Sequence, residues 1–298
     1  MNNTIFAFPK PKNEPVLGYK PGSPERKEIR KALDELYNVV TDIPAIIGGK
    51  EVRTAETGTI VMPTENHHVL AKYYKVGEKE VQMAIDAAMK AHEEWANTPW
   101  IDRASVMQKI ATLICGKYRW LINAATMLGQ GKTTMQAEID SACELADFLR
   151  WNAFYASQIY SDQPVSDPGT LNYVTYRPLE GFVFAITPFN FTSIASNLCM
   201  SPALMGNVCI WKPSTTAMLS NYLLMKIYKE AGLPDGVVNF LPGSGSLIGK
   251  VAFASPDLAG VHFTGSTGTF NSFWKSIGDN IANYKTYPIT GYNIGYAV

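Results

Sequence analysis

The sequence predicts an α/β fold, a doubly wound parallel sheet of the Rossmann-like type with an N-terminal helical layer. From Gly181 onward, short apolar runs alternate with helical patterns, which indicates β-α-β units joined by right-handed crossovers. The runs 182–186 and 208–211 are continuously apolar, as expected of parallel strands buried on both faces. We expect strands over residues 182–187, 207–212, 236–241 and 260–264. We expect helices over residues 191–204, 216–231, 245–253 and 267–283.

The chain before Gly181 is mainly helical by its pattern. Ser23 followed by Pro24 predicts a helix start, since Ser is a favoured cap and Pro suits the first helical position. This helix should run to about Val40, and residues 46–71 indicate short strands with turns. Amphipathic spacing predicts four more helices, over residues 78–95, 101–118, 118–128 and 133–159. In the last of these, Ile139 belongs to the stripe expected to face the interior.

These patterns divide the chain into five parts. Prolines and a glycine at 164, 168 and 169 interrupt the helical pattern, and residues 171–176 are strand-prone, so a surface hairpin is expected there. The last ten residues carry no charge and form a divergent tail. The five parts are an extension with one helix at 1–45, the helical layer with small strands at 46–162, the hairpin at 163–180, the Rossmann-like core at 181–288 and the tail at 289–298.

The composition excludes several classes of protein. Lys plus Arg and Asp plus Glu both number 26 among 298 residues, and this zero formal net charge argues against general binding to nucleic acid. No run reaches the ~20 apolar residues of a membrane span. The four cysteines lack CxxC spacing and indicate buried thiols, so neither a disulfide framework nor a metal site is expected. The N-terminal residues show neither a secretory pattern nor an arginine-bearing mitochondrial leader.

Polar residues follow the first two predicted strands, at the edge where open α/β sheets bind their ligands. Thr187, Phe189 and Asn190 follow the first strand, and Lys212 ends the second. The Asn190 amide can donate a hydrogen bond to a developing oxyanion, and Lys212 can bind ribose hydroxyls or a phosphate. Each has an alternative role without a ligand. Asn190 can cap the next helix, and Lys212 can reach from the strand end into solvent.

Small and hydroxyl-bearing residues follow the third and fourth strands. Gly243, Gly245 and Gly249 form a GxGxxxG pattern, which by itself is weak evidence because glycines after a strand often only turn the chain. The fourth strand leads directly into a helix, whose first N–H groups suit a pyrophosphate. The residues at this junction are Gly265, Ser266, Thr267, Gly268 and Thr269. The alternative is an ordinary Ser or Thr helix cap.

Three motifs in order resemble the motif series of the aldehyde dehydrogenase superfamily. They are ITPFNF at 186–191, WKPS at 211–214 and FTGST at 263–267. Longer stretches resemble one branch of the superfamily, whose members oxidise glutamate γ-semialdehyde. They are GQGKT at 129–133, RPLEGFVFAITPFNFTSIA at 177–195, ALMGNV at 203–208 and FTGSTGTF at 263–270. The resemblance extends from about Glu14 to Pro288 and so covers most of the chain.

The resemblance implies a cofactor, a reaction and roles for the strand-end residues. The reaction is the NAD-dependent oxidation of L-glutamate γ-semialdehyde, in equilibrium with 1-pyrroline-5-carboxylate, to L-glutamate in proline catabolism. By this resemblance Asn190 stabilises the oxyanion, and Thr187 and Phe189 flank the nicotinamide. Lys212 and residues 265–269 contact the rest of the cofactor, with Ser266 as the chief phosphate contact. Thr215 stands where many relatives carry an acid that discriminates the adenosine ribose, so NADP stays open as an alternative cofactor.

The resemblance also implies partners and a location. The small-molecule partner is an aldehyde, and the chain forms a homo-oligomer. Residues 163–180 resemble part of a hairpin that helps to join subunits in the family, while a plain surface hairpin is the alternative. The family location is the mitochondrial matrix. A cytoplasmic location stays open because no leader pattern is present.

Two catalytic groups of the superfamily have no match in this sequence. The family reaction needs a cysteine thiolate that attacks the aldehyde and a glutamate that activates water. That glutamate lies in a GExGGK motif soon after a Tyr-Pro or Phe-Pro step, but residues 289–298 after Tyr287-Pro288 contain neither Glu nor GGK. None of Cys115, Cys143, Cys199 and Cys209 matches the nucleophile. The alternative function, which the residues favour for this chain alone, is a catalytically inactive NAD-binding or subunit-pairing fragment.

Overall fold

The computed structural model describes residues 8–286 and 288–292. Its main sheet has seven strands in the order β10-β9-β6-β7-β8-β2-β3. The strands β6 to β10 all run parallel, and β2 pairs antiparallel with both β8 and β3. The strands of this sheet are β2 (Ala45–Ile47), β3 (Lys50–Val52), β6 (Phe182–Ile186), β7 (Val208–Lys212), β8 (Val238–Phe240), β9 (Leu258–Phe263) and β10 (Ile289–Tyr292).

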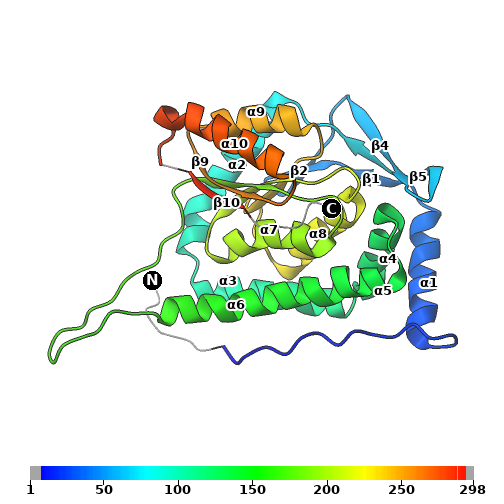
Figure 1. The fold of residues 1–298 in the computed structure, drawn as a ribbon, viewed down its shortest axis with the longest axis horizontal. Coiled ribbons are helices and arrows are strands. Elements are labelled where there is room, and N and C mark those ends of the chain that lie inside the picture. The colour runs from blue at the N-terminus through cyan, green and yellow to red at the C-terminus, as the bar shows by residue number, and fades with distance from the viewer. Residues whose placement is uncertain (1–7, 287, 293–298) are drawn as a thin grey trace.

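Helices cover both faces of this sheet (Figure 1). One face carries α2 (Glu78–Asn97), α9 (Gly245–Ala254) and α10 (Thr267–Asp279). The other carries α7 (Thr192–Leu204) and α8 (Met218–Ala231). Outside α7 and α8 lies a further layer made of α3 (Trp100–Cys115), α4 (Arg119–Gln130) and α6 (Leu145–Ser161). The predicted doubly wound α/β fold with a helical layer is confirmed, but α2 lies across the sheet from the other helices of that layer.

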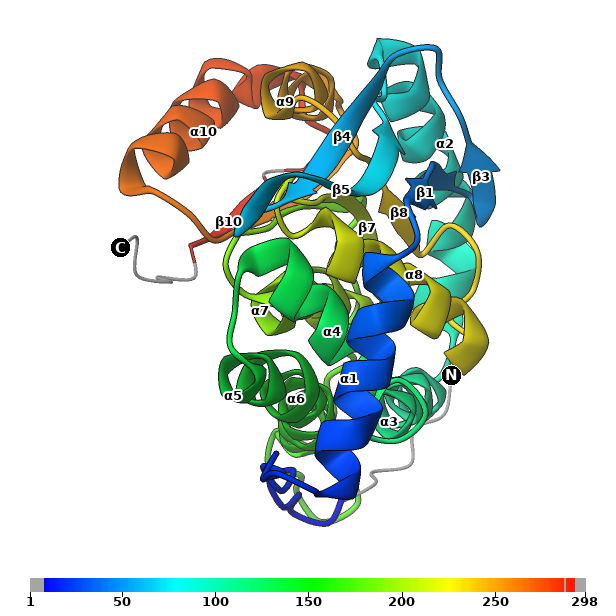
Figure 2. The same cartoon turned by 90° about the vertical axis from the view of Figure 1, so that its right-hand side faces the viewer.

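The described structure also contains a smaller three-stranded sheet and the helix α1 (Figure 2). Its strands are β1 (Thr41–Ile43), β4 (Thr57–Met62) and β5 (Glu65–Tyr74). The helix α1 (Pro24–Tyr37) packs against α4. Ser23 caps α1 as predicted, because its Oγ accepts a hydrogen bond from the Arg26 N–H at 3.2 Å.

The four predicted strands correspond to β6 to β9, and their side chains form the centre of the core. Phe182, Phe184 and Trp211 are among the largest fully buried side chains. The sheet nevertheless has three strands more than the four that the apolar runs predicted. Two of them, β2 and β3, come from the N-terminal third of the chain, and Ile46 pairs with Phe240.

The third additional strand comes from the C-terminal tail. Residues 289–292, assigned to a divergent tail, form β10 and pair in parallel with β9, with Ile289 opposite Gly260. β10 therefore covers one edge of β9, while β6 covers the other. The rest of the tail, residues 293–298, lies outside the described residues.

The long helix predicted over 133–159 contains a π-helical turn. It consists of α5 (Thr134–Ala137), the π-helix η1 (Glu138–Glu144) and α6 in direct succession. A π-turn takes one residue more than an α-turn, so it rotates the side chains around the axis. The prediction that Ile139 faces the interior is wrong for this reason. Its side chain is 47% exposed, and Glu138 and Asp140 are buried instead.

Residues 163–180 form an arm that extends away from the body (Figure 1). A surface hairpin was predicted here, and the strand-prone stretch 171–176 forms no β-ladder within the described residues. Side chains cross-link the two limbs instead. The Val174 N–H donates to Gln163 Oε1 at 2.9 Å, and the Asn172 N–H donates to Ser166 Oγ at 3.0 Å.

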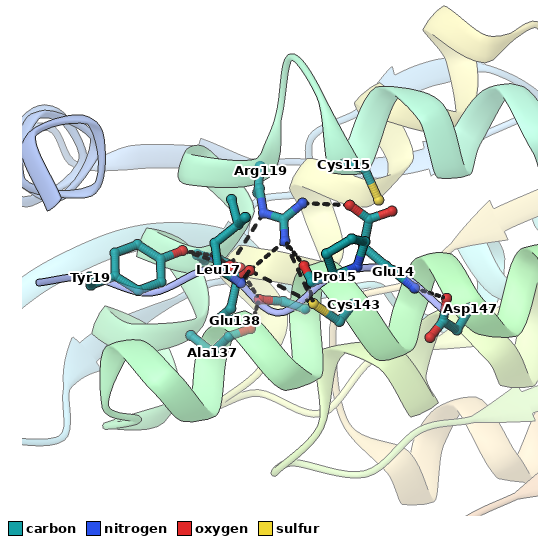
Figure 3. Close-up of polar contacts among 12 residues, drawn as sticks. Glu14, Pro15, Leu17, Tyr19, Cys115, Arg119, Ala137, Glu138, Cys143 and Asp147 are labelled. Carbon is teal, nitrogen blue, oxygen red and sulfur yellow. Dashed lines mark hydrogen bonds and ion pairs between the residues drawn. The ribbon is translucent and has the colours of Figure 1, made fainter. Parts of the chain in front are cut away.

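The N-terminal extension is held on the helical layer by buried charges (Figure 3). The Glu14 carboxylate pairs with Arg119 at 2.7 Å and with Arg150 at 2.6 Å. Glu138 accepts the Leu17 N–H at 2.8 Å and the Tyr19 hydroxyl at 2.6 Å. The extension thus contacts α4, η1 and α6 through specific polar groups.

His262 on β9 completes a hydrogen bond that Pro202 removes from α7. Proline has no N–H, so Pro202 cannot donate to the Leu198 carbonyl four residues before it. The Nδ1 atom of His262 lies 3.0 Å from that carbonyl oxygen, so the ring must carry its proton there to satisfy it. Burial lowers the pKa of His262, which favours the neutral ring.

Replacing His262 with Leu should lower the free energy of unfolding by about 1–3 kcal/mol, because a buried carbonyl loses its donor. The native protein should also lose stability as pH falls below 6.5, the ordinary pKa of histidine. The folded pKa is lowered, so below this pH the unfolded chain takes up a proton that the folded chain resists. Urea titrations near neutral pH and about one unit below 6.5 measure both effects. Equal pH dependence in native and variant protein would contradict this assignment.

Candidate functional site

The carboxyl ends of β6, β7 and β9 meet at one edge of the sheet. After β7 and β8 the chain returns to the opposite side of β6 to form β9, so the strand order reverses there. The Thr187 N–H donates to the Lys212 carbonyl at 3.2 Å, and the Thr264 N–H donates to the Ile186 carbonyl at 3.3 Å. These contacts bring the predicted residues Thr187 and Lys212 beside the start of α10. Doubly wound sheets bind their ligands at such a reversal point.

The side chain of Lys212 is partly buried and turns toward the start of α9. A Cβ atom built on Gly245 would lie 3.8 Å from Lys212 Nζ. Burial lowers the pKa of Lys212, and its ammonium has no hydrogen-bond or ion-pair partner within the part of the chain that the structure describes. A partly desolvated, uncompensated cation fits a binding role better than the alternative of a lysine that simply extends into solvent.

Asn190 does not cap α7, although capping was its alternative role. Phe191 occupies the cap position, and the Asp140 carboxylate accepts the N–H groups of Thr192 at 3.0 Å and Ser193 at 2.9 Å. The Asn190 side chain has no hydrogen-bond partner among the described residues. Its amide is therefore available to a ligand, beside a Phe189 ring that is 59% exposed.

The segment between β9 and α10 fits both roles that the sequence predicted for it. Ser266 is the cap of α10, because its Oγ accepts the Thr269 N–H at 3.2 Å. Thr267 and Gly268 lie exposed in the first turn of the helix. A Cβ on Gly265 would come within 2.4 Å of the Phe263 ring, so close packing requires glycine there. The helix thus begins directly at the binding edge with its first turn open to solvent.

A groove between α9 and α10 was missed by the sequence analysis. Its volume is ≈ 390 Å³, and its lining includes Gly245, Ser246, Gly249, Phe253 and Ser272. Gly245 also neighbours the Lys212 ammonium, so the groove begins where that cation lies. The available signal was the GxGxxxG pattern. Its small residues leave room on one face of α9, but the pattern alone was too weak to show this.

Residues 51–286 match the aldehyde dehydrogenase family. The chain belongs to this family. A probable delta-1-pyrroline-5-carboxylate dehydrogenase of Schizosaccharomyces pombe is 50% identical over 287 residues, which cover 95% of this chain and 52% of that protein. The mitochondrial delta-1-pyrroline-5-carboxylate dehydrogenase of Homo sapiens is 46% identical over 276 residues, which cover 93% of this chain and 49% of that protein. The chain spans about half the length of the curated relatives it matches.

Solved structures support the same fold for this aldehyde dehydrogenase chain. The delta-pyrroline-5-carboxylate dehydrogenase from Mycobacterium tuberculosis bound with NAD matches with a TM-score of 0.96 and 47% identity. The match covers 99% of this chain and 55% of that one. The 1-pyrroline-5-carboxylate dehydrogenase from Thermus with bound NAD matches with a TM-score of 0.89 and 29% identity, covering 98% of this chain and 56% of that one. Both names agree with the branch that the sequence motifs resemble.

The four cysteines of this aldehyde dehydrogenase chain all lie in environments that suppress reactivity. Burial raises the pKa of Cys115 and of Cys143, each to about 12. Cys199 and Cys209 are fully buried, and this burial raises the pKa of both thiols. A protonated thiol is a poor nucleophile. The prediction of buried thiols is confirmed for Cys143, Cys199 and Cys209, whereas Cys115 is only partly buried.

All four thiols should react slowly with Ellman's reagent in the native chain and rapidly in denaturant. Native thiols at neutral pH are protonated and shielded, and unfolding removes both protections. The measurement follows, by absorbance, the rate at which the reagent releases thionitrobenzoate with and without urea. Cys115 is only partly buried and should react first among the four. A native thiol that reacts as fast as in urea would contradict the assigned environments.

Proposed function

We propose that this chain forms the NAD-binding part of a dehydrogenase that oxidises L-glutamate γ-semialdehyde, the open form of 1-pyrroline-5-carboxylate, to L-glutamate in proline catabolism. The observation that carries this proposal is the uncompensated Lys212 ammonium at the reversal point of the sheet, with the α9–α10 groove beside it. Relatives and solved structures named for this enzyme support it, and two of those structures are named as containing NAD.

We assign the proposed NAD site to the strand ends, the start of α10 and the α9–α10 groove. Lys212 would bind the ribose hydroxyls or a phosphate, and the first turn of α10, with Ser266, Thr267, Gly268 and Thr269, would hold the pyrophosphate. The groove between α9 and α10 would take the adenosine end. Thr187 and Phe189 would flank the nicotinamide. Thr215 is exposed and neutral, so nothing acidic at this position repels a 2′-phosphate, and NADP is the alternative cofactor.

In the proposed oxidation, the cofactor and the side chains of this protein have different roles. NAD, when bound, accepts a hydride from the substrate carbon. Asn190 would donate a hydrogen bond from its amide to the substrate oxygen as negative charge develops there. The chain offers no reactive thiol for the covalent step, because the pKa values of its cysteines are raised by burial. The second candidate function, a cofactor-binding or subunit-pairing fragment without turnover, rests on this observation.

The arm 163–180 supports a proposed role in joining subunits. The arm exposes three large apolar side chains, since Val165, Leu171 and Tyr173 are 88%, 78% and 58% exposed. Exposed apolar side chains that lie together are typical of surfaces that bind another protein. A mitochondrial location is proposed from relatives that are named as mitochondrial, among them those of Homo sapiens and Dictyostelium discoideum. No helix among the described residues is long and apolar enough to cross a membrane.

Replacing Lys212 with Ala should weaken NAD binding by about tenfold or more, because a charge-assisted hydrogen bond is lost. Isothermal calorimetry with the purified chain measures the affinity. Lys117→Ala is the matched control. The Lys117 ammonium pairs with Glu230 at 2.8 Å on the surface, and its removal should leave NAD affinity unchanged. Equal NAD affinity in native protein and Lys212→Ala would remove Lys212 from the site.

The 298-residue chain given NAD and glutamate γ-semialdehyde should form no NADH above background, as followed by absorbance. Covalent catalysis needs an activated nucleophile, and an oxyanion donor alone cannot replace it. Continuing the chain after Pro288 with a relative's remaining sequence should give turnover. In that extended protein Asn190→Ala should lower kcat by about 10²–10³ while NAD affinity changes little. Steady NADH formation by the unextended chain, abolished by mutating one of its cysteines, would overturn the fragment hypothesis.

A further inference from the structure

The first turn of α7, two residues after Asn190, is held by a buried carboxylate from another helix. Asp140 is 1% exposed, and its two oxygens accept the N–H groups of Thr192 and Ser193. These are donors that the helix itself leaves without a partner. A carboxylate at a helix N-terminus also offsets the positive end of the helix dipole. The interaction therefore fixes both the position and the direction in which α7 begins.

Lys132 completes this arrangement from the segment after α4. Its ammonium donates to Asp140 Oδ2 at 2.7 Å, which balances the buried negative charge. The same ammonium lies 4.0 Å from the centre of the Phe191 ring, the residue directly after Asn190. Lys132 thus contacts both the carboxylate that holds α7 and the chain that enters it.

The π-turn η1 and a set of hydroxyl groups hold the opposite sides of the same turn. Glu144, also in η1, accepts the Ser193 hydroxyl at 3.0 Å. Thr192 Oγ1 lies 2.9 Å from the hydroxyls of both Thr126 and Ser220. The backbone N–H groups and the hydroxyls of Thr192 and Ser193, the first two residues of α7, therefore all have partners. The backbone therefore has little conformational freedom at the start of α7, two residues after Asn190.

We propose that Asp140, balanced by Lys132, is a positioning residue for Asn190. It fixes the backbone entering α7, and with it the position and direction from which the Asn190 side chain extends before any substrate arrives. An oxyanion donor is effective when it needs no reorganisation as the charge develops. The inference rests on the oxyanion role proposed above for Asn190. It extends that role to two residues that touch neither the substrate nor the cofactor.

The test follows the Asn190 side chain in the native chain by NMR. In ¹⁵N-labelled protein, the Asn190 side-chain signal is identified by its loss in Asn190→Ala. In Asp140→Ala this signal should shift and broaden, and hydrogen exchange at the Thr192 and Ser193 amides should accelerate by about tenfold or more, since charge-assisted bonds are removed. Lys132→Met keeps the carboxylate but should also shift the Asn190 signal. It serves as the test if Asp140→Ala does not fold.

The matched control is Asp147→Ala, on the same long helix. Asp147 accepts the Glu14 N–H at 2.8 Å and makes no hydrogen bond to α7 among the described residues. This variant should lower the urea midpoint without moving the Asn190 signal or the two exchange rates. An Asp140→Ala protein that is less stable but keeps the native Asn190 signal would reduce Asp140 to a structural residue and overturn the proposal. NAD titration of the native chain is run separately. Its failure would overturn the proposed function and leave the positioning result intact.

Discussion

The structure around the site depends on one buried ion pair, between Glu138 and Arg119 (Figure 3). Their side chains are 0% and 4% exposed, so both charged groups are desolvated. Buried charges are stable only when an opposite charge compensates them. Burial alone would raise the pKa of Glu138, but hydrogen bonds from Arg119, Tyr19 and the Leu17 N–H outweigh it and leave that pKa lowered. Removing Arg119 would leave the fully buried Glu138 carboxylate without a countercharge, at a cost of about 3–5 kcal/mol, whereas Arg119 would keep Glu14 if Glu138 were removed. The pair fixes the helical layer against which α7 packs.

The π-turn η1 connects this ion pair to the binding edge. Glu138 and Asp140 are two residues apart in η1, yet one holds the N-terminal extension and the other holds the start of α7. A regular α-helix would direct these side chains differently, because the extra residue of a π-turn changes every direction after it. Wide helical turns of this kind are frequent at functional sites. The irregularity therefore supports Asn190 from a distance, through groups that are buried and fully paired.

Local sequence patterns predicted the strands of the core, but they could not predict contacts between residues far apart in the chain. The apolar runs located β6 to β9 because buried parallel strands require continuous apolar residues. The same reasoning placed Thr187 and Lys212 at one edge of the sheet. It could not assign β2 to the sheet, since Ile46 pairs with Phe240 almost two hundred residues later. Nor could it find Asp140 as the partner of α7, because a 3.6-residue period has no means of showing a π-turn.

Cofactor binding and covalent chemistry make different structural demands on a protein chain. Binding at a sheet edge needs strand ends, helix N-termini and a cation, and these all come from residues 182–279 in consecutive β-α units. Covalent attack needs a thiolate, and a thiolate needs solvent or a nearby positive charge to stabilise it. Cys199 and Cys209 lie in the core, in α7 and β7, whereas Cys115 and Cys143 lie beside arginines that are already paired with carboxylates. Burial outweighs these positive charges and raises the pKa of all four thiols. A reactive thiol at Cys209 would leave a charge in the middle of the core. The close packing beneath the carboxyl ends of the strands is therefore also the reason that the pKa values of Cys199 and Cys209 are raised.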